Sequence, residues 1–370
     1  MSTVSDARVD VLVIGAGPSG LCLADALSRS TALSIAVVER DTIGSTWMHS
    51  PPELRVLSPW WTNILSFRDL FRHSPFALVR ARAYLEHLQE FAQRRAIRVT
   101  TGVTITSVVQ GDGAWIATAE DGRTWHAPYV VCATGYFSAP AMPEPAFESD
   151  GSVPTIHAAE IGDYDRYARV FAGKHVLVVG KRVTAGQLLV EFASRGVSVT
   201  LSATAPIQFH RSGAWGYAVD QTYFLYEAAR IRLQPGLTSN SYPPMEGGRA
   251  RRLLESGVVA RVDRLAQIRD GAVVLEDGSR LHTDYVVLAT GYRPALDYLS
   301  RLDLTKGRDG LPRLCGFELA DAPGIFVLGF DNLRNFRSRY LRGIRSDAKL
   351  LAKDIAARVG GRHQEKASTS

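Results

Sequence analysis

Three glycines near the start of the chain, Gly15, Gly17 and Gly20, have the G-x-G-x-x-G spacing that suits a bound dinucleotide. The first permits a tight turn from strand to helix, the second lets a pyrophosphate approach the backbone, and the third lets helix and strand pack closely. Pro18 and Ser19 stand at the start of the expected helix, where free N–H groups attract phosphate. The chemistry expected here is therefore that of a bound dinucleotide.

The elements that must position this turn surround it in the sequence. A short apolar run, 11–14, precedes the glycines, and a second run, 35–38, ends at Glu39. Glu39 lies ~20 residues beyond the glycines, where a carboxylate accepts hydrogen bonds from ribose hydroxyls. Arg40 follows as a further candidate contact. Strand, glycine turn, helix, strand and acid thus occur in the order of a dinucleotide-binding unit.

The chain contains a second copy of this design. Residues 174–203 show the pattern of a strand, a glycine-containing turn at Gly180, a helix and a strand. Downstream of each copy, an Asp-Gly hairpin signal is followed, after ten residues, by an Ala-Thr-Gly-Tyr segment, at 133–136 and at 289–292. The repeat predicts two dinucleotide-binding units in series. Further candidate cofactor contacts are Ala133, Thr134, Gly135, Lys181, Arg182, Thr184, Thr290, Gly291 and Asp331.

Composition narrows the class of protein. The 370 residues are 46% hydrophobic with a net charge of +6, which is ordinary for a globular chain of two or three domains. There is no signal-peptide pattern and no apolar run near the ~20 residues of a membrane span, so we expect a cytoplasmic protein. Cys22, Cys132 and Cys315 are far apart, which disfavours a disulfide framework, a metal site or a redox dithiol. We expect Cys22 and Cys132 to be buried.

Several stretches allow more than one interpretation. The aromatic residues that follow Glu39 could line a substrate pocket, but a core role is favoured for most of Trp47, Trp60, Trp61 and Phe67. Residues 205–250 are expected to be irregular, and a closing helix is predicted over 333–358. The arginines between 334 and 345 are expected mainly on a solvated face, with a cofactor, acidic substrate or partner subunit as the less favoured contact.

With these motifs the chain resembles the two-dinucleotide-binding-domain flavoproteins, and among them the class B flavin-dependent monooxygenases. Gly44 and Trp47 match the G-x-W loop of that family, and Ala289–Pro294 matches its ATGYRP motif. The stretch from Phe147 to His157 is loosely similar to its linker motif. The resemblance implies an α/β fold with two Rossmann-like dinucleotide-binding domains, the second inserted into the first. It places the FAD-binding domain at 1–155 and 281–370 and an NAD(P)H-binding-like domain at 156–280.

The chain departs from the family pattern at two places. Arg182 occupies the position of the middle glycine in the second turn, and no arginine follows the next strand until Arg211 to hold a 2′-phosphate. Near the flavin, Leu57 replaces an Asn that helps to hold the hydroperoxide in family members, and Asn63 lies nearby but off register. The resemblance therefore leaves His157 and Asn63 as candidate catalytic residues.

The leading hypothesis is an FAD-dependent monooxygenase that is reduced by NADPH or NADH. Such enzymes form a C4a-hydroperoxyflavin and transfer oxygen from O₂ to nitrogen, sulfur or a ketone of a small molecule. The alternative is a flavoprotein oxidase or dehydrogenase that is reduced by its own substrate and has a degenerate nicotinamide site. A non-catalytic module that senses flavin or nucleotide is a third hypothesis. No nucleic-acid or membrane partner is expected, and the sequence leaves a homodimer open.

Overall fold

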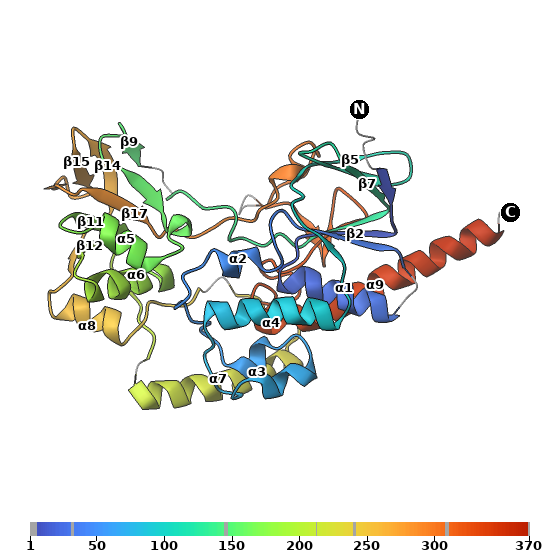
Figure 1. Cartoon of the computed structure of the whole chain (residues 1–370), viewed down its shortest axis with the longest axis horizontal. Coiled ribbons are helices and arrows are strands. Elements are labelled where there is room, and N and C mark those ends of the chain that lie inside the picture. Colours follow the sequence, from blue (N-terminus) through green and yellow to red (C-terminus); the bar gives the residue numbers. More distant parts are fainter. Residues whose placement is uncertain are drawn as a thin grey trace.

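The computed structural model describes residues 6–30, 33–143, 147–211, 213–239, 242–307 and 311–368. They form two α/β lobes that are joined by two extended connections (Figure 1). The first lobe carries both ends of the described chain, and the second is built from the middle of the sequence. The second domain is thus inserted into the first, as the resemblance implied.

The first lobe is built on a seven-stranded sheet with the strand order β18-β19-β20-β8-β2-β3-β4. Its strands from β20 to β4 run parallel, and their residues are apolar without alternation because both faces of the sheet are covered. The strand bounds are β2 Val11–Ile14, β3 Ile35–Val38, β4 Val99–Thr100, β8 Tyr129–Cys132, β18 Leu314–Cys315, β19 Glu318–Leu319 and β20 Ile325–Val327.

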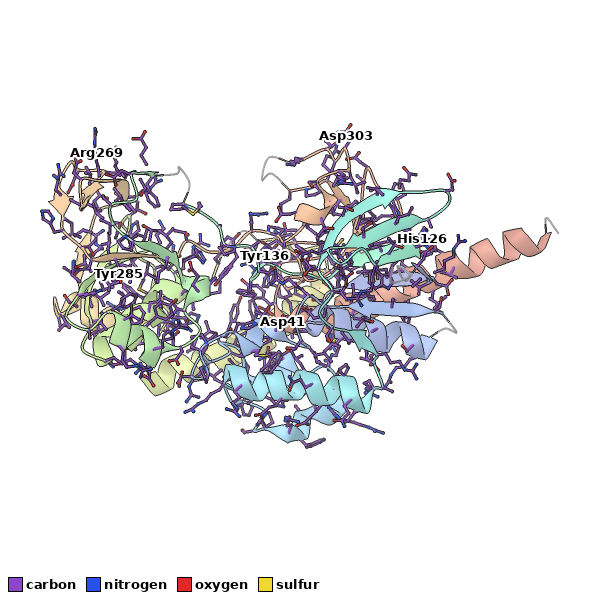
Figure 2. All side chains as sticks on the ribbon, turned by 45° about the horizontal axis from the view of Figure 1, so that its top comes forward. Asp41, His126, Tyr136, Arg269, Tyr285 and Asp303 are labelled. Carbon is purple, nitrogen blue, oxygen red and sulfur yellow. The ribbon has the colours of Figure 1, made fainter. Side chains whose placement is uncertain are left out.

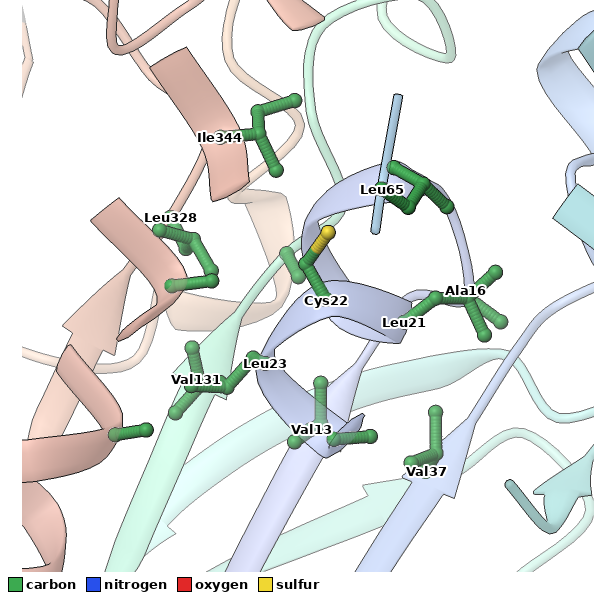
Figure 3. Close-up of a cluster of buried hydrophobic side chains, with 14 of the residues drawn as sticks. Val13, Ala16, Leu21, Cys22, Leu23, Val37, Leu65, Val131, Leu328 and Ile344 are labelled. Atoms are coloured by element: carbon green, nitrogen blue, oxygen red, sulfur yellow. The ribbon is translucent and has the colours of Figure 1, made fainter. Parts of the chain in front are cut away.

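Three helices cover one face of this sheet: α1 Pro18–Ser30, α4 Ala81–Arg94 and α9 Leu341–Ser368. Figure 3 shows α1 packed between the strands and α9, with Leu21 and Cys22 among residues such as Val13 and Ile344. Cys22 and Cys132 are buried in this lobe, which confirms their predicted core role.

A smaller sheet covers the opposite face. Its strand order is β1-β7-β6-β5, and the predicted Asp-Gly turn at 121–122 joins β6 to β7. Apolar residues of these strands pack against the sheet residues that point away from α1. The bounds are β1 Asp6–Arg8, β5 Ile105–Gln110, β6 Trp115–Ala119 and β7 Thr124–Ala127.

Short helices fill the chain between β3 and α4. They are α2 Ser45–Met48, α3 Trp60–Asn63 and the 3₁₀ helix η1 Phe67–Arg72.

Next to these short helices, His87 of α4 is fully buried against the rings of Trp60, Tyr84 and Phe91, and its Nε2 lies 3.9 Å from a carboxylate oxygen of Asp69. Burial lowers the pKa of His87 to about 4, although the Asp69 carboxylate partly opposes the shift. The imidazole is therefore neutral at pH 7.

The second lobe has a parallel sheet with the order β10-β17-β11-β12-β13 and an antiparallel β16-β15-β14 unit edged by β9. Helices α5 Tyr164–Val170, α6 Val183–Ser194 and α8 Arg249–Glu255 pack on the parallel sheet, with η2 Ala158–Glu160 after β10. The strand bounds are β9 Glu148–Ser149, β10 Thr155–His157, β11 His175–Val179, β12 Ser198–Ser202, β13 Ala260–Val262, β14 Leu265–Arg269, β15 Ala272–Leu275, β16 Arg280–Leu281 and β17 Tyr285–Leu288.

Strand pairing favours other domain boundaries than the predicted ones. The predicted return to the first domain is at residue 281, whereas β17 still pairs with β11 and β10 of the second lobe. The predicted start at residue 156 falls inside β10, and β9 already pairs with β14. We propose that the second domain runs from β9 to β17.

The two connections between the lobes pair with each other. The amide of Ala141 donates to the carbonyl of Gly291 at 3.0 Å, and the amide of Arg293 donates to the carbonyl of Ala139 at 2.9 Å. A bridge between Pro140 and Tyr292 lies between these bonds. The Ala-Thr-Gly-Tyr segments therefore lead into a two-stranded hinge, followed by η3 Asp297–Leu299.

Two helical predictions need correction. The stretch 205–250 contains a 21-residue helix, α7 Gly213–Leu233, which is labelled at the lower edge of Figure 1. The closing helix begins at Leu341 instead of residue 333, because 333–340 folds into turns that bring the carbonyl of Arg337 against Gly343. Within the described ranges, no helix is both long and apolar enough to cross a membrane.

Candidate functional site

The three glycines of the first turn have different surroundings. A Cβ on Gly15 would lie 2.6 Å from the carbonyl oxygen of Ala133, and Gly15 has a φ of +107°. A Cβ on Gly20 would lie 1.9 Å from the carbonyl oxygen of Gly15. A Cβ on Gly17 would meet no atom within 4 Å. Gly15 and Gly20 are thus required by the fold, whereas Gly17, directly before α1, leaves open space at the helix N-terminus that suits a pyrophosphate.

Glu39 lies beside this turn and is only 9% exposed. Its Oε2 accepts a hydrogen bond from the amide of Ala16 at 2.7 Å, and its Oε1 accepts from the amide of Asp41 at 3.2 Å and the hydroxyl of Ser45 at 3.3 Å. A carboxylate has about four acceptor positions, so one remains for a ribose hydroxyl. Arg40, the neighbouring candidate, is exposed.

The G-x-W loop packs against the same turn. Gly44 has a φ of +73°, and its amide donates to the carbonyl of Ala16 at 3.2 Å. The ring of Trp47 lies 4.7 Å from that of Tyr84. Of the aromatic residues that follow, Trp60 is fully buried as expected, but Phe67 is 73% exposed. Leu57, at the family's Asn position, is also exposed.

The two threonines of the repeated segments tie the connections together. Thr134 donates its hydroxyl to the carbonyl of Ala295 at 2.7 Å, and Thr290 donates to the carbonyl of Ala141 at 2.6 Å. Each hydroxyl therefore bonds the opposite connection, which gives both side chains a role in the hinge. Gly135 and Gly291 have positive φ values, as the tight turns before the hinge require.

The second glycine turn keeps only part of the first design. Gly180 has a φ of +147°, and a Cβ there would lie 2.6 Å from the carbonyl oxygen of Ala289, which repeats the contact of Gly15 with Ala133. Lys181 donates to the hydroxyl of Thr204 at 2.9 Å. Arg182 directly precedes α6 in the place of the open glycine, and Thr184 lies half-buried in the first turn of that helix.

The side chain of Arg182 reaches toward the first lobe. Its guanidinium lies 4.0 Å from the ring centre of Tyr242, and the guanidinium of Arg339 lies 4.1 Å from the same ring. Arg339 also pairs with Asp331 at 2.8 Å, and the amide of Asp331 donates to the hydroxyl of Tyr136 at 2.8 Å. Figure 2 shows Tyr136 where the lobes meet. Asp331 thus belongs to a polar chain that links the two lobes.

Tyr242 and Arg339 belong to this polar network between the lobes, and the sequence did not indicate either of them as a site residue. Tyr242 lies in a stretch without periodicity, and Arg339 was grouped with the other arginines. That grouping on a solvated face is wrong for most of its members, because each of them pairs with a carboxylate and is at most 28% exposed. The pairs are Arg334 with Asp347, Arg337 and Arg342 with Glu227 of α7, and Arg339 with Asp331.

His157 lies at the hinge and caps a short helix. Its Nδ1 accepts from the amide of Ala159 at 3.0 Å, so the ring proton is on Nε2, and its own amide donates to Glu160. The ring packs edge-on against Tyr292 at 5.2 Å and is 7% exposed. Burial lowers the pKa of His157, and the Gly291 backbone and Glu160 only partly oppose this shift. The ring is neutral at pH 7 and held in one orientation.

Asn63, the other candidate catalytic residue, makes its hydrogen bonds within its own turn. The side chain is fully buried, and its amide nitrogen donates to the carbonyls of Ser58 and Pro59. Its oxygen accepts from the hydroxyls of Ser58 and Thr62. Because every polar atom of this amide is engaged within its own turn, the structure gives Asn63 a structural role.

The cysteines do not form a reactive pair. Burial raises the pKa of the Cys22 and Cys132 thiols to about 12, and Cys315 is exposed on a different strand. All three thiols are free. A dithiol for thiol–disulfide exchange within this chain is therefore not available.

Comparison with known proteins agrees with this architecture. The chain is 24% identical to an uncharacterized CzcO-like oxidoreductase of Geobacillus kaustophilus, over 94% of this chain and 98% of that protein. It is also 24% identical to the indole-3-pyruvate monooxygenase YUCCA6 of Arabidopsis thaliana, over 93% and 89%. The fold matches a flavin-containing monooxygenase from Stenotrophomonas maltophilia with a TM-score of 0.75 and 23% identity, over 95% and 99%. Residues 12–329 match the family described as pyridine nucleotide-disulphide oxidoreductase, and the chain therefore belongs to that family.

Proposed function

We propose that this protein is an FAD-dependent monooxygenase that takes electrons from NADPH or NADH and oxygenates a small molecule at nitrogen, sulfur or a ketone. The observation that carries the proposal is the contrast among the three glycines of the first turn, since only Gly17 faces open space. A turn that served packing alone would not need a bare backbone at that position. Relatives that cover nearly the whole chain include monooxygenases, which supports this choice of reaction.

The residues of the first lobe fit FAD. The N-terminus of α1 and Gly17 would hold the pyrophosphate, and Glu39 would accept bonds from the ribose. The loop at Gly44 and Trp47 borders the same turn and would limit the access of water. When bound, the flavin supplies hydride acceptance and reaction with O₂, so the protein itself needs to bind, orient and exclude water.

The second lobe would bind the nicotinamide dinucleotide. Gly180 preserves the sharp strand-to-helix turn, and α6 directs its N-terminus to the same place. In the first turn, backbone N–H groups next to Gly17 would bind the phosphates. In the second turn, Lys181 and Arg182 place positive side chains at the corresponding position. In this proposal they hold phosphate through charge, and the reach of Arg182 toward Tyr242 keeps its guanidinium near the first lobe.

His157 has a positioning role in the proposed enzyme. Its neutral ring packs on Tyr292 and its backbone is capped by Glu160, so it fixes the start of the second lobe against the hinge. The fixed ring would hold the two lobes in the orientation that hydride transfer requires. No proton transfer by His157 is needed for this role.

A second candidate function follows from Arg182. If its side chain excludes the dinucleotide, the protein would be an oxidase or dehydrogenase whose own substrate reduces the flavin. Thiol–disulfide exchange is disfavoured because Cys22 and Cys132 are buried and the exposed Cys315 forms no pair with either of them.

Anaerobic stopped-flow mixing of the FAD-loaded protein with NADPH and, separately, NADH tests the proposal. We expect rapid loss of the oxidised flavin absorbance with at least one nicotinamide and, after oxygen is added, incorporation of one ¹⁸O atom from O₂ into a substrate of the stated classes. Failure of both nicotinamides to reduce the flavin would favour the oxidase. Reduction followed only by hydrogen peroxide, with no oxygenated product from amine, sulfide or ketone panels, would contradict the monooxygenase.

A further inference from the structure

A second polar site lies on the first lobe, away from the glycine turn. A cavity of about 280 Å³ opens between the C-terminal half of α1, the segment 65–68, the end of α4 and the start of α9. The charged groups that line it are Asp25, Arg29, Arg68, Arg95, Arg345 and Lys349. Four separate parts of the chain thus bring five cations and one carboxylate to one concave surface.

The single carboxylate is already engaged. Asp25 pairs with Arg29 at 2.9 Å and with Arg95 at 3.3 Å. Among the described residues, Arg68, Arg345 and Lys349 pair with no carboxylate. The cavity therefore keeps a large excess of positive charge, whereas arginines elsewhere in this lobe, such as Arg334, have a partner.

Arg345 is the most unusual of these cations. It is largely covered, and its Nη1 is buried with no hydrogen-bond partner among the described residues. Its guanidinium lies 4.7 Å from the ring centre of Phe67, which is itself 73% exposed. A buried charged donor without a partner is costly, and an anion in the cavity that Arg345 lines would offset part of that cost through its charge.

The cavity is separate from the proposed FAD site. Asp25 lies on α1, eight residues beyond Gly17, which corresponds to about 12 Å at the ~1.5 Å rise of an α-helix. The cavity borders the C-terminal half of α1, where the negative end of the helix dipole attracts cations. The pyrophosphate of FAD belongs at the opposite end, the helix N-terminus. An anion in this cavity would leave the glycine turn free.

We propose that this cavity binds a phosphate or diphosphate group. Guanidinium groups suit phosphate oxygens because they donate two parallel hydrogen bonds, and three cations without carboxylate partners match more than one negative charge. The volume fits a compact anion and its ester. The ester could be a soluble metabolite or a lipid headgroup, and the exposed rings of Phe67 and Phe71 at η1 would contact the acyl region in the second case.

Isothermal titration of the FAD-loaded protein with pyrophosphate at low ionic strength tests this site. We expect saturable binding that weakens as salt is added. The double variant Arg68→Gln/Lys349→Gln removes two cations from the rim and should raise the pyrophosphate Kd about tenfold or more. Arg345→Met should have a similar effect, but because it alters a covered residue, the rim variant is the decisive one.

Two controls separate this cavity from general charge and from the nicotinamide site. Arg269→Gln removes a cation at the far end of the second lobe (Figure 2) and should leave the Kd unchanged. Arg182→Gln should also leave it unchanged if pyrophosphate binds in the cavity. The proposal is overturned if the rim variant binds as the wild type does, or if either control loses as much affinity as the rim variant.

Vesicles distinguish the source of the phosphate. Co-sedimentation is measured with phosphatidylcholine vesicles that contain phosphatidic acid, and with phosphatidylcholine alone. Binding to the acidic vesicles that is lost in the rim variant and in Phe67→Ser/Phe71→Ser identifies a lipid headgroup as the ligand. Binding of pyrophosphate without vesicle binding identifies a soluble ligand, and binding of neither contradicts the site. Loss of nicotinamide-dependent reduction in the same variants is not expected, so failure of the proposed function would be seen separately.

Discussion

Replacement of Gly17 by Ala should separate FAD binding from folding. A Cβ at this position would meet no protein atom within 4 Å, and the backbone there is not in the left-handed region. Gly17 precedes the first residue of α1, where an exchange of Gly for Ala costs about 1 kcal/mol or less. The folded apoprotein should therefore lose little stability, and its thermal midpoint should fall by no more than about 2 °C.

The effect on FAD should be much larger. The added methyl group would occupy the space in which a pyrophosphate oxygen meets the backbone N–H groups at the start of α1. The loss of one charge-assisted hydrogen bond costs about 1.5–3 kcal/mol, which corresponds to a rise in Kd of roughly 10- to 100-fold. Glu39 and the rest of the site are untouched, so the variant should still bind FAD weakly.

Gly20→Ala is the matched control for this experiment. Its Cβ would lie 1.9 Å from the carbonyl oxygen of Gly15, so α1 would have to move away from β2. Such overpacking costs about 1–3 kcal/mol or more, and it should lower the stability of the apoprotein itself. Urea unfolding of the apoproteins and titration with FAD give the two quantities. A Gly17→Ala protein that binds FAD as tightly as the wild type would refute the placement of the pyrophosphate, and an unperturbed Gly20→Ala apoprotein would refute the packing argument.

Three other predictions concern single residues. His87, whose pKa falls from 6.5 to about 4 on folding, gains protons more readily in the unfolded chain, so stability should be lost progressively as the pH falls from 6.5 to about 4. The total loss is roughly 3 kcal/mol, and His87→Phe should remove that slope from urea unfolding measured at pH 7 and pH 5; an unchanged slope would assign it to other groups. Arg182→Gly should raise the apparent Kd for the nicotinamide, because the proposed enzyme holds phosphate through the charge of Arg182. A lower Kd would show instead that the side chain obstructs the second turn. Asn63→Ala removes the amide that donates to the Ser58 carbonyl and accepts from the Ser58 hydroxyl, and it should cost about 1–3 kcal/mol in stability. The rate of flavin reduction in the folded protein should be unchanged, and a slower reduction at equal stability would support a catalytic role for Asn63.

The sequence predicted the features that depend on a few neighbouring residues. The first glycine turn, the strand that precedes it and the Asp-Gly hairpin at 121–122 were recognised because backbone geometry at these positions demands particular residue types. The buried state of Cys22 and Cys132 followed from the apolar residues around them. The internal repeat also predicted that two similar units occur in one chain, and each has its own parallel sheet.

Local sequence patterns did not predict which strands and charged side chains pair when they lie far apart in the sequence. The identical Tyr-Val-Val triplets at 129–131 and 285–287 each join their own sheet, and this pairing favours a domain boundary after β17 over the predicted one at residue 281. The helix α7 was missed because no apolar stripe marks its docking face, which is held by Glu227 and the arginines 337 and 342. Their separation of more than a hundred positions leaves no local periodic signal.

At the site itself, the sequence determined which residue types were present, and only the tertiary structure decided what each one contacts. Gly15, Gly17 and Gly20 have the same side chain, but two face backbone atoms and one faces open space. Thr134 and Thr290 were candidate cofactor contacts, yet their hydroxyls bond the opposite connection of the hinge. A residue's role depends on which groups from elsewhere in the chain satisfy its hydrogen bonds and charge, and that choice is made only when the lobes pack together.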